Sequence, residues 1–241
     1  MPPSIAALPT LPGLVVARML DASLAALAWL LAERGVPILV AGRDAAVGAS
    51  LLDAVVDALP AERRPDAAAA GKAGRLVRVA GTLASGTMPG ILRAALAVTT
   101  GQSGLAALVD APDLAGVLDV LAGQGLTGDE ASFLGVILVV ERRPDVAGEP
   151  RVVAAHYLRP LMLDAAGHPR RERPAILATW DARDDRWDDF AWGIAPDLAE
   201  RIRMRSGDFE VERRRRTVLL EDLVARGQLD QGVLAAAARV G

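Results

Sequence analysis

Residues 36–59 read VPILVAGRDAAVGASLLDAVVDAL. The run from Val36 to Ala41 is short, continuous and apolar, which is typical of a strand buried on both faces of a parallel sheet. A turn follows this run, and Ser50 to Leu59 is expected to form a helix. Strand, turn and helix in this order are the opening unit of a parallel α/β fold.

The chain before this unit predicts an extended lead-in and a buried helix. Residues 1–13 carry four prolines and are expected to be extended. The apolar stretch from Leu14 to Leu31 is interrupted by charged residues, so it is expected to be a buried helix and not a membrane span. Its leucines recur at helical spacing, with Asp21 or Ser23 as the N-cap and Gly35 as the stop.

The rest of the chain predicts an α/β fold with a mostly parallel sheet, extended by a C-terminal β-hairpin and a helical appendage. Strands are expected at residues 75–80, 104–109, 133–141, 152–163 and 174–180, and helices at residues 89–98 and 114–121 and from Pro196 onward. The turn signal Asp164 to Gly167 is expected to join the last two strands. Near residue 150 the expected order of elements changes from alternating strands and helices to two strands followed by helices. We therefore divide it into a core, residues 1–150, and a hairpin with helices, residues 151–241.

Composition excludes several classes of function. Of the 241 residues, 52% are hydrophobic, and the formal charge of −3 gives no broad attraction to nucleic acid or anionic lipid. The absence of cysteine excludes disulfides, thiol nucleophiles and thiolate metal sites. The single lysine, Lys72, lies in an alanine-rich loop expected at residues 60–74. No targeting signal is recognisable, so a cytoplasmic location without direct membrane insertion is expected.

The segment from Asp21 to Leu59 resembles the P-loop region of the secretion ATPase superfamily, the motors of type II and type IV secretion and of type IV and tight-adherence pili. In that family a helix leads to ILVAGPTGSGKTTLLNAL, and residues 38–55 here, ILVAGRDAAVGASLLDAV, align with it without a gap. Arg75 to Thr82 stands where the family has its acidic Walker B strand. Thr100 to Gly104 resembles the family's Thr-Gly-His-x-Gly box. The resemblance covers roughly residues 20–145 and implies a RecA-like P-loop core.

The sequence departs from this motif at the positions that carry its chemistry. A working P-loop cradles phosphates with backbone N–H groups, neutralises charge with its lysine and holds Mg²⁺ with a hydroxyl. Here Gly48 stands at the lysine position and Ala49 at the Mg²⁺-ligand position, and Thr82 and Gln102 replace the Walker B acid and the box histidine. If the alignment is shifted so that Ser50 supplies the hydroxyl, Ala49 stands at the lysine position, and the lysine is still missing. The resemblance therefore implies a pseudo-ATPase with no catalytic residues, no metal site and no cofactor.

Nucleotide binding without hydrolysis stays open as an alternative, with ATP and Mg²⁺ as the ligands. Its candidate residues form a degenerate loop: Gly42, Arg43, Asp44, Gly48, Ala49 and Ser50. A helix that begins near Ser50 would offer free N–H groups and the positive end of its dipole. Arg43 would add a cation, whereas Asp44 would repel a phosphate. The competing interpretation is an ordinary strand-to-helix turn that binds nothing.

A second candidate surface is rich in aspartate and tryptophan. Its members are Trp180, Asp184, Asp185, Arg186 and Trp187. Close carboxylates are able to bind a divalent cation or to act as an acid–base pair. The interleaved arginines favour local ion pairing on an exposed hairpin, and clustered tryptophan and arginine are typical of a protein contact.

Two further features predict structural roles. His156 and His168 lack an acidic partner at ligand spacing, so they predict no metal site. The run Arg213 to Arg216 is flanked by acidic residues that cancel much of its field, so we expect a solvated helix face and not a phosphate site.

Together these features predict a non-catalytic, secretion-ATPase-like protein that acts as a partner or regulatory subunit of an export or pilus machine. Its partners would be proteins, among them an intact secretion or pilus ATPase, and it would reach the inner face of the membrane only through them. The parent family assembles as hexamers, so the resemblance also implies self-association. Two alternatives remain, an ATPase with a variant P-loop and a protein-binding module that uses the C-terminal Asp/Trp segment.

Overall fold

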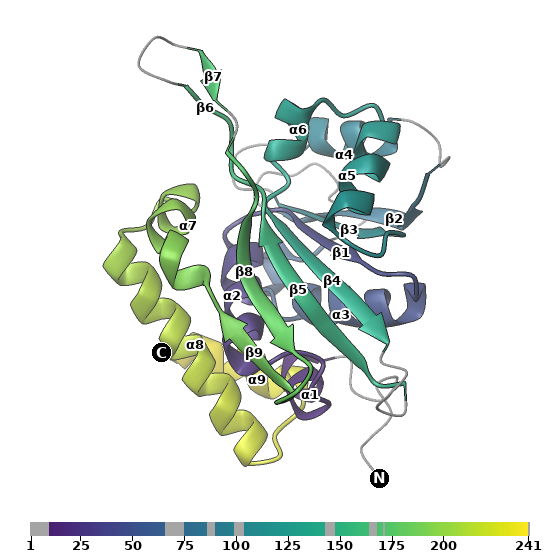
Figure 1. Cartoon of the computed structure of the whole chain (residues 1–241). Coiled ribbons are helices and arrows are strands. Elements are labelled where there is room, and N and C mark those ends of the chain that lie inside the picture. Colours follow the sequence, from purple (N-terminus) through teal and green to yellow (C-terminus); the bar gives the residue numbers. More distant parts are fainter. Residues whose placement is uncertain are drawn as a thin grey trace.

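A computed structural model of the chain has one seven-stranded sheet with helices on both faces (Figure 1). The structure describes residues 10–65, 75–85, 90–98, 104–142, 148–163, 168–170 and 172–240. The strands lie in the order β2-β3-β1-β4-β5-β8-β9. The expected α/β class is therefore confirmed.

The sheet is mixed. Its strands are β1 (Ile38–Ala41), β2 (Val77–Leu83), β3 (Leu105–Val109), β4 (Val136–Arg142), β5 (Pro150–Tyr157), β8 (Ala175–Asp181) and β9 (Arg186–Asp189). Neighbouring strands from β2 to β4 pair in parallel, and those from β4 to β9 pair antiparallel. The mostly parallel sheet expected from the sequence is thus limited to the first four strands, and β5, β8 and β9 extend it with antiparallel pairing.

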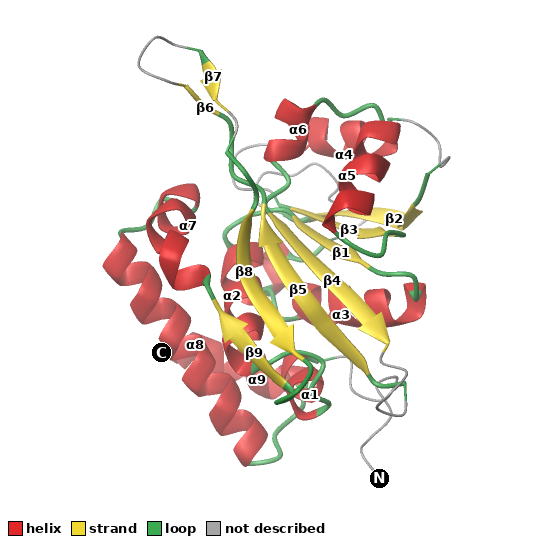
Figure 2. Cartoon of the chain, viewed as in Figure 1, coloured by secondary structure: helices red, strands yellow, loops and turns green. Residues whose placement is uncertain are grey.

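Helices cover the sheet in two groups (Figure 2). One face packs against α1 (Leu11–Val16), α2 (Ala22–Glu33), α3 (Ala45–Asp57), α7 (Ala195–Arg201), α8 (Ser206–Ala225) and α9 (Gln231–Val240). The other face packs against α4 (Ile91–Val98), α5 (Leu114–Gly123) and α6 (Gly128–Ser132). Short 3-10 helices lie at Ala61–Arg63 and Ala191–Ile194.

Strand β1 is fully buried, as its apolar run predicts. Side chains alternate between the faces of a sheet, so Ile38 and Val40 join the core under α2 and α3, while Leu39 and Ala41 join the core under α4 and α5. Each of these residues is at most 1% exposed. The strand therefore contributes side chains to both apolar cores.

The interpretation of Leu14 to Leu31 as a single helix is wrong, whereas the helix expected from Asp21 to Gly35 is confirmed as α2. The apolar stretch forms two helices, because the chain turns between them with Arg18 in the left-handed region at φ 54°. Asp21 then caps α2 by accepting a hydrogen bond from the Leu24 N–H at 2.8 Å. The extended lead-in also ends earlier than expected, since α1 begins at Leu11, and residues 1–9 of that lead-in lie outside the described residues.

The strand expected at residues 152–163 is also shorter in the structure. Strand β5 ends at Tyr157, and the chain then leaves the sheet to form a separate hairpin, β6 (Met162–Leu163) and β7 (Pro169–Arg170), before it returns as β8. The expected turn at residues 164–167 lies outside the described residues. Because β5, β8 and β9 continue the same sheet, the change near residue 150 marks the switch from parallel to antiparallel strands.

Candidate functional site at the carboxyl edge of the parallel strands

The segment that resembles a P-loop connects β1 to α3 at the carboxyl edge of β1. In open α/β sheets, ligands bind in the crevice outside the carboxyl ends of the strands. A groove of about 720 Å³ opens at this place. It is lined by Arg43, Asp44, Ala45, Val47, Pro112, Val140, Glu141 and Arg142. This volume lies within the range of small-molecule sites.

Asp44 occupies the N-terminal end of α3 with its own carboxylate. Oδ1 accepts hydrogen bonds from the N–H groups of Ala46 and Val47, at 3.1 Å each, and Arg142 Nε donates to Oδ2 at 2.5 Å. The Arg142 hydrogen bond, helped by that of Val47, lowers the pKa of Asp44, so the group is anionic at neutral pH. A fixed anion therefore already lies where a helix N-terminus would hold a phosphate.

The helix expected from Ser50 begins five residues earlier, at Ala45, because Asp44 caps it. Gly48, Ala49 and Ser50 consequently lie inside α3 and not in a loop, and the Ser50 hydroxyl donates to the Ala46 carbonyl at 3.0 Å. Of the six candidate loop residues, the structure brings only Gly42, Arg43 and Asp44 together in the turn.

Gly42 has a packing role in this turn. Its N–H donates to the Val109 carbonyl of β3 at 3.1 Å. A Cβ atom at Gly42 would lie 2.7 Å from the Val140 carbonyl oxygen of β4, closer than real Cβ atoms come. The glycine therefore allows the chain to leave β1 between its two neighbouring strands.

The groove carries charges of both signs. Arg142 is paired with Asp44 and also donates to the Gly148 carbonyl at 3.1 Å. Arg43 and Glu141 are exposed, and neither forms an ion pair with any residue that the structure describes. Sequence reasoning missed Arg142, although it directly follows the strand expected at residues 133–141. Nothing local in the sequence links that strand end to Asp44.

Other positions of the family motif do not reach this groove. Thr82 lies on β2, and β3 separates β2 from β1. Gln102 and most of the expected box, as well as Lys72, lie outside the described residues.

The Asp/Trp surface consists of the β8–β9 hairpin, and part of it faces inward. Asp185 accepts hydrogen bonds from Trp180 Nε1 at 2.9 Å and from Arg151 Nε at 3.2 Å, and its second oxygen pairs with Arg18 Nε at 2.9 Å. Burial opposes ionisation of Asp185, but the hydrogen bonds from Arg151 and Trp180 outweigh it, so its pKa is lowered. Trp187 packs on the core and donates from Nε1 to the Val152 carbonyl at 2.7 Å.

The outward part of this hairpin forms weak ion pairs. Arg186 lies 3.7 Å from Asp184 and 3.6 Å from Asp188, and all three side chains are well exposed. Within the described parts of the chain, no group of acidic or histidine residues is arranged to hold a metal ion. His156 is half-buried in β5, where burial lowers its pKa, which suits a structural role.

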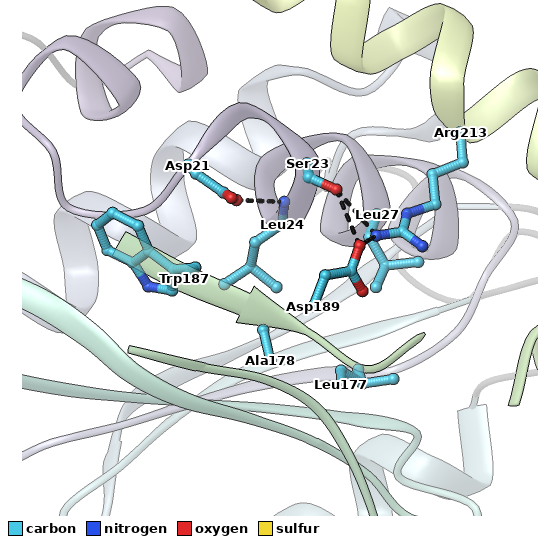
Figure 3. A pocket seen from close by; sticks show the side chains of 9 residues that line it. All are labelled: Asp21, Ser23, Leu24, Leu27, Leu177, Ala178, Trp187, Asp189 and Arg213. Atoms are coloured by element: carbon cyan, nitrogen blue, oxygen red, sulfur yellow. Dashed lines mark hydrogen bonds and ion pairs between the residues drawn. The ribbon is translucent and has the colours of Figure 1, made fainter. Parts of the chain in front are cut away.

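The arginine run of α8 is partly buried, so the expectation of a solvated face is wrong for half of it. A cavity of about 10 Å³, about the space of one water molecule, lies where α2, α8 and the β8–β9 hairpin meet (Figure 3). There Arg213 donates to the Ser23 hydroxyl at 2.9 Å and pairs with Asp189. Burial raises the pKa of Asp21 beside them.

Arg216 lies one turn further along α8. It pairs with Glu33 at 2.8 Å and with Glu212 at 2.7 Å, and its guanidinium stacks 4.2 Å from the centre of the Trp29 ring. Only Arg214 of the four is exposed. The run thus fixes α8 to α2 instead of binding phosphate.

The fold and this groove define an α/β protein with a ligand-sized crevice at the carboxyl edge of its parallel strands. Neither a known protein-family model nor a curated protein matches the chain. No helix in the described part of the chain is both long and apolar enough to cross a membrane.

Proposed function

We propose that the chain is a pseudo-ATPase of the secretion-motor type, with a RecA-like core, that serves as a partner or regulatory subunit of an export or pilus machine. The ungapped resemblance of residues 38–55 to the family's P-loop supports this proposal. The place of that segment supports it too, because it joins a central parallel strand to a helix at the carboxyl edge of the sheet.

The carboxylate of Asp44 is the observation that supports the proposed lack of ATP hydrolysis. Phosphoryl transfer depends on positive groups that stabilise the charge of the phosphates. Here a carboxylate takes the N–H groups of Ala46 and Val47 and one guanidinium, that of Arg142. A phosphate at this place would lose those donors and be repelled by Asp44.

The Asp/Trp module is the weaker alternative. Asp185 and Trp187 would have to leave partly buried hydrogen bonds before they could contact a partner. That cost favours a structural role for the inward half of the hairpin.

The test is titration of the purified chain with a fluorescent ATP analogue, with and without Mg²⁺, followed by a phosphate-release assay. We expect neither saturable binding nor release. In the variant Asp44→Gly, which frees the helix N-terminus, we expect saturable binding of the analogue to become measurable, still without release. Ser50→Ala is the matched control, and we expect it to change nothing. Saturable binding with release by the wild-type chain would refute the proposal.

The partner role needs a separate measurement. A motor ATPase from the same cells is co-expressed with the chain, and co-elution and the hydrolysis rate of the motor are followed. We expect the chain to co-elute and to change that rate. A motor that neither binds the chain nor responds to it argues against this part of the proposal.

A further inference from the structure

Helix α8 has one face packed on the core and one face in solvent. Its buried residues lie on the side that packs against α1, α2 and α7: Phe209, Arg213, Arg216, Leu220 and Leu223. On the opposite face Val211 is 71% exposed and Val218 is 54% exposed. In Figure 1 this helix runs along the outside of the molecule. Single exposed apolar residues are common, but these two recur seven residues apart on one line of the helix.

The same line continues to both ends of α8. Gly207 lies four residues before Val211, and Ala225 lies seven residues after Val218, and both are exposed. At 100° per residue these four positions fall within one narrow stripe. Spacings of four and seven residues form the seam of a helix pair, and small residues at its ends let two helices approach closely.

Charged residues border this stripe in a matching order. Arg214 and Glu221 lie on one flank, and Arg215 and Asp222 lie on the other, and the members of each pair are seven positions apart. Arg215 is already paired with Glu212, and Asp222 with Arg226. By contrast, Arg214 and Glu221 form no ion pair with any other residue in the described ranges.

We infer that the outer face of α8 binds the same face of α8 in a second copy of the chain, antiparallel about a two-fold axis. In an antiparallel helix pair, residues on the same flank face each other, so Arg214 of one copy meets Glu221 of the other, and the reverse. The axis then passes beside Val218. Val218 packs against its own symmetry mate, and Val211 packs against Ala225 of the second copy.

The charges also decide the orientation. In a parallel pair, opposite flanks face each other at the same height. Arg214 would then meet Arg215, and Glu221 would meet Asp222. Only the antiparallel pair joins unlike charges along both flanks.

The interface is small, so we expect a weak and reversible dimer. A helix of 20 residues is about 30 Å long, and one such pair buries less area than a standard protein interface. Each exposed ion pair contributes little to binding and is screened by salt. The dimer should therefore dissociate on dilution and in high salt. This inference does not rest on the proposed function, because no nucleotide chemistry enters it.

The test is sedimentation velocity over a concentration series at low and high salt. The single variants Arg214→Glu and Glu221→Arg place like charges against each other at both symmetric positions, so we expect each to raise the dissociation constant about tenfold. The double variant restores unlike pairs and should dimerise like the wild type. An equimolar mixture of the two single variants should form heterodimers. Arg173→Glu, an equal charge change at an exposed position outside α8, is the control.

All of these side chains are exposed, so the variants should fold, and far-UV circular dichroism checks this. A wild-type chain that stays monomeric at the highest concentration overturns the inference. So does a dimer that the two single variants leave unchanged, since it would use another surface, or a double variant that fails to recover. Binding of α8 to the helix of a different protein would appear as a monomeric chain in this experiment and would likewise overturn it.

Discussion

Asp44 and Asp185 show how one carboxylate decides the character of a turn. Each accepts backbone or indole N–H groups and also pairs with an arginine from a distant strand, Arg142 or Arg151. Nothing in the local sequence distinguishes Asp185 from its neighbour Asp184. Yet the Arg151 side chain behind Asp185 is 2% exposed, while Asp184 is 63% exposed.

This difference predicts unequal effects of two adjacent substitutions. Asp185→Ala leaves the Trp180 indole N–H without this acceptor and removes one of the two carboxylates, Asp185 and Glu149, that pair with the buried Arg151, so we expect the free energy of unfolding to fall by about 2 kcal/mol. Asp184→Ala removes only an exposed ion pair, so we expect a change within about 0.5 kcal/mol. Urea unfolding of both variants measures the two values. Equal effects would mean that the hairpin does not depend on the Asp185 contacts.

At the scale of one residue, the sequence therefore predicted the candidates better than their roles. It singled out Asp44 as unfavourable for phosphate, and the structure adds the reason, its bonds to the head of α3. It could not supply Arg142 as the partner, because 98 residues separate the two in the chain. Such pairs are made by strand order, which local patterns do not encode.

The element scale is where the sequence was most informative. The apolar run of β1 and the leucine spacing of α2 predicted both elements, because burial on two faces and helical periodicity leave direct traces. The start of α3 was misplaced by five residues, since the similarity to a P-loop suggested a loop where Asp44 caps the helix. Helix α6, which opens with a capping box from Thr127 to Glu130, was not foreseen. At five residues it is too short to show a period.

Two glycines of the P-loop-like segment predict opposite stability effects. Gly42→Ala would push a Cβ atom against the Val140 carbonyl, so we expect a loss of about 2 kcal/mol in the free energy of unfolding. Gly48 lies inside α3, where an added Cβ would stay 3.5 Å from Leu108 and 3.6 Å from Val40, an ordinary contact. Gly48→Ala should therefore stabilise the chain by about 0.5–1 kcal/mol.

Thermal and urea unfolding of the two alanine variants decide this point. If α3 began near Ser50, Gly48 would lie in a loop and the alanine variant would gain no helix propensity. A destabilised Gly48→Ala chain would thus contradict the helix start at Ala45. A neutral Gly42→Ala chain would contradict the close approach of the turn to β4.

At the scale of the whole molecule, the first 150 residues and the rest share one core. Helix α2 is buried between the sheet and α8, and Leu27, Leu31 and Phe209 belong to the same apolar cluster as Tyr157 of β5. The Thr10 hydroxyl also donates to the Leu229 carbonyl at 2.7 Å, joining both ends of the described chain. A division near residue 150 therefore cuts through a continuous sheet.

This continuity predicts that a chain ending after Glu149 does not fold on its own. Such a chain would leave β4 as an open edge and would expose the face of α2 that α8 covers, including Trp29, on whose ring Arg216 stacks. Fully burying one leucine side chain contributes about 1.5–3 kcal/mol. Losing several apolar contacts of this size would cost as much as the whole free energy of unfolding of an ordinary domain. A chain ending after Asp230, which lacks only α9, keeps the sheet and α8 and should still unfold in one cooperative step, with a lower midpoint. Thermal unfolding followed by circular dichroism separates the two, and a cooperative transition in the shorter chain would show that the parallel half is a domain in its own right.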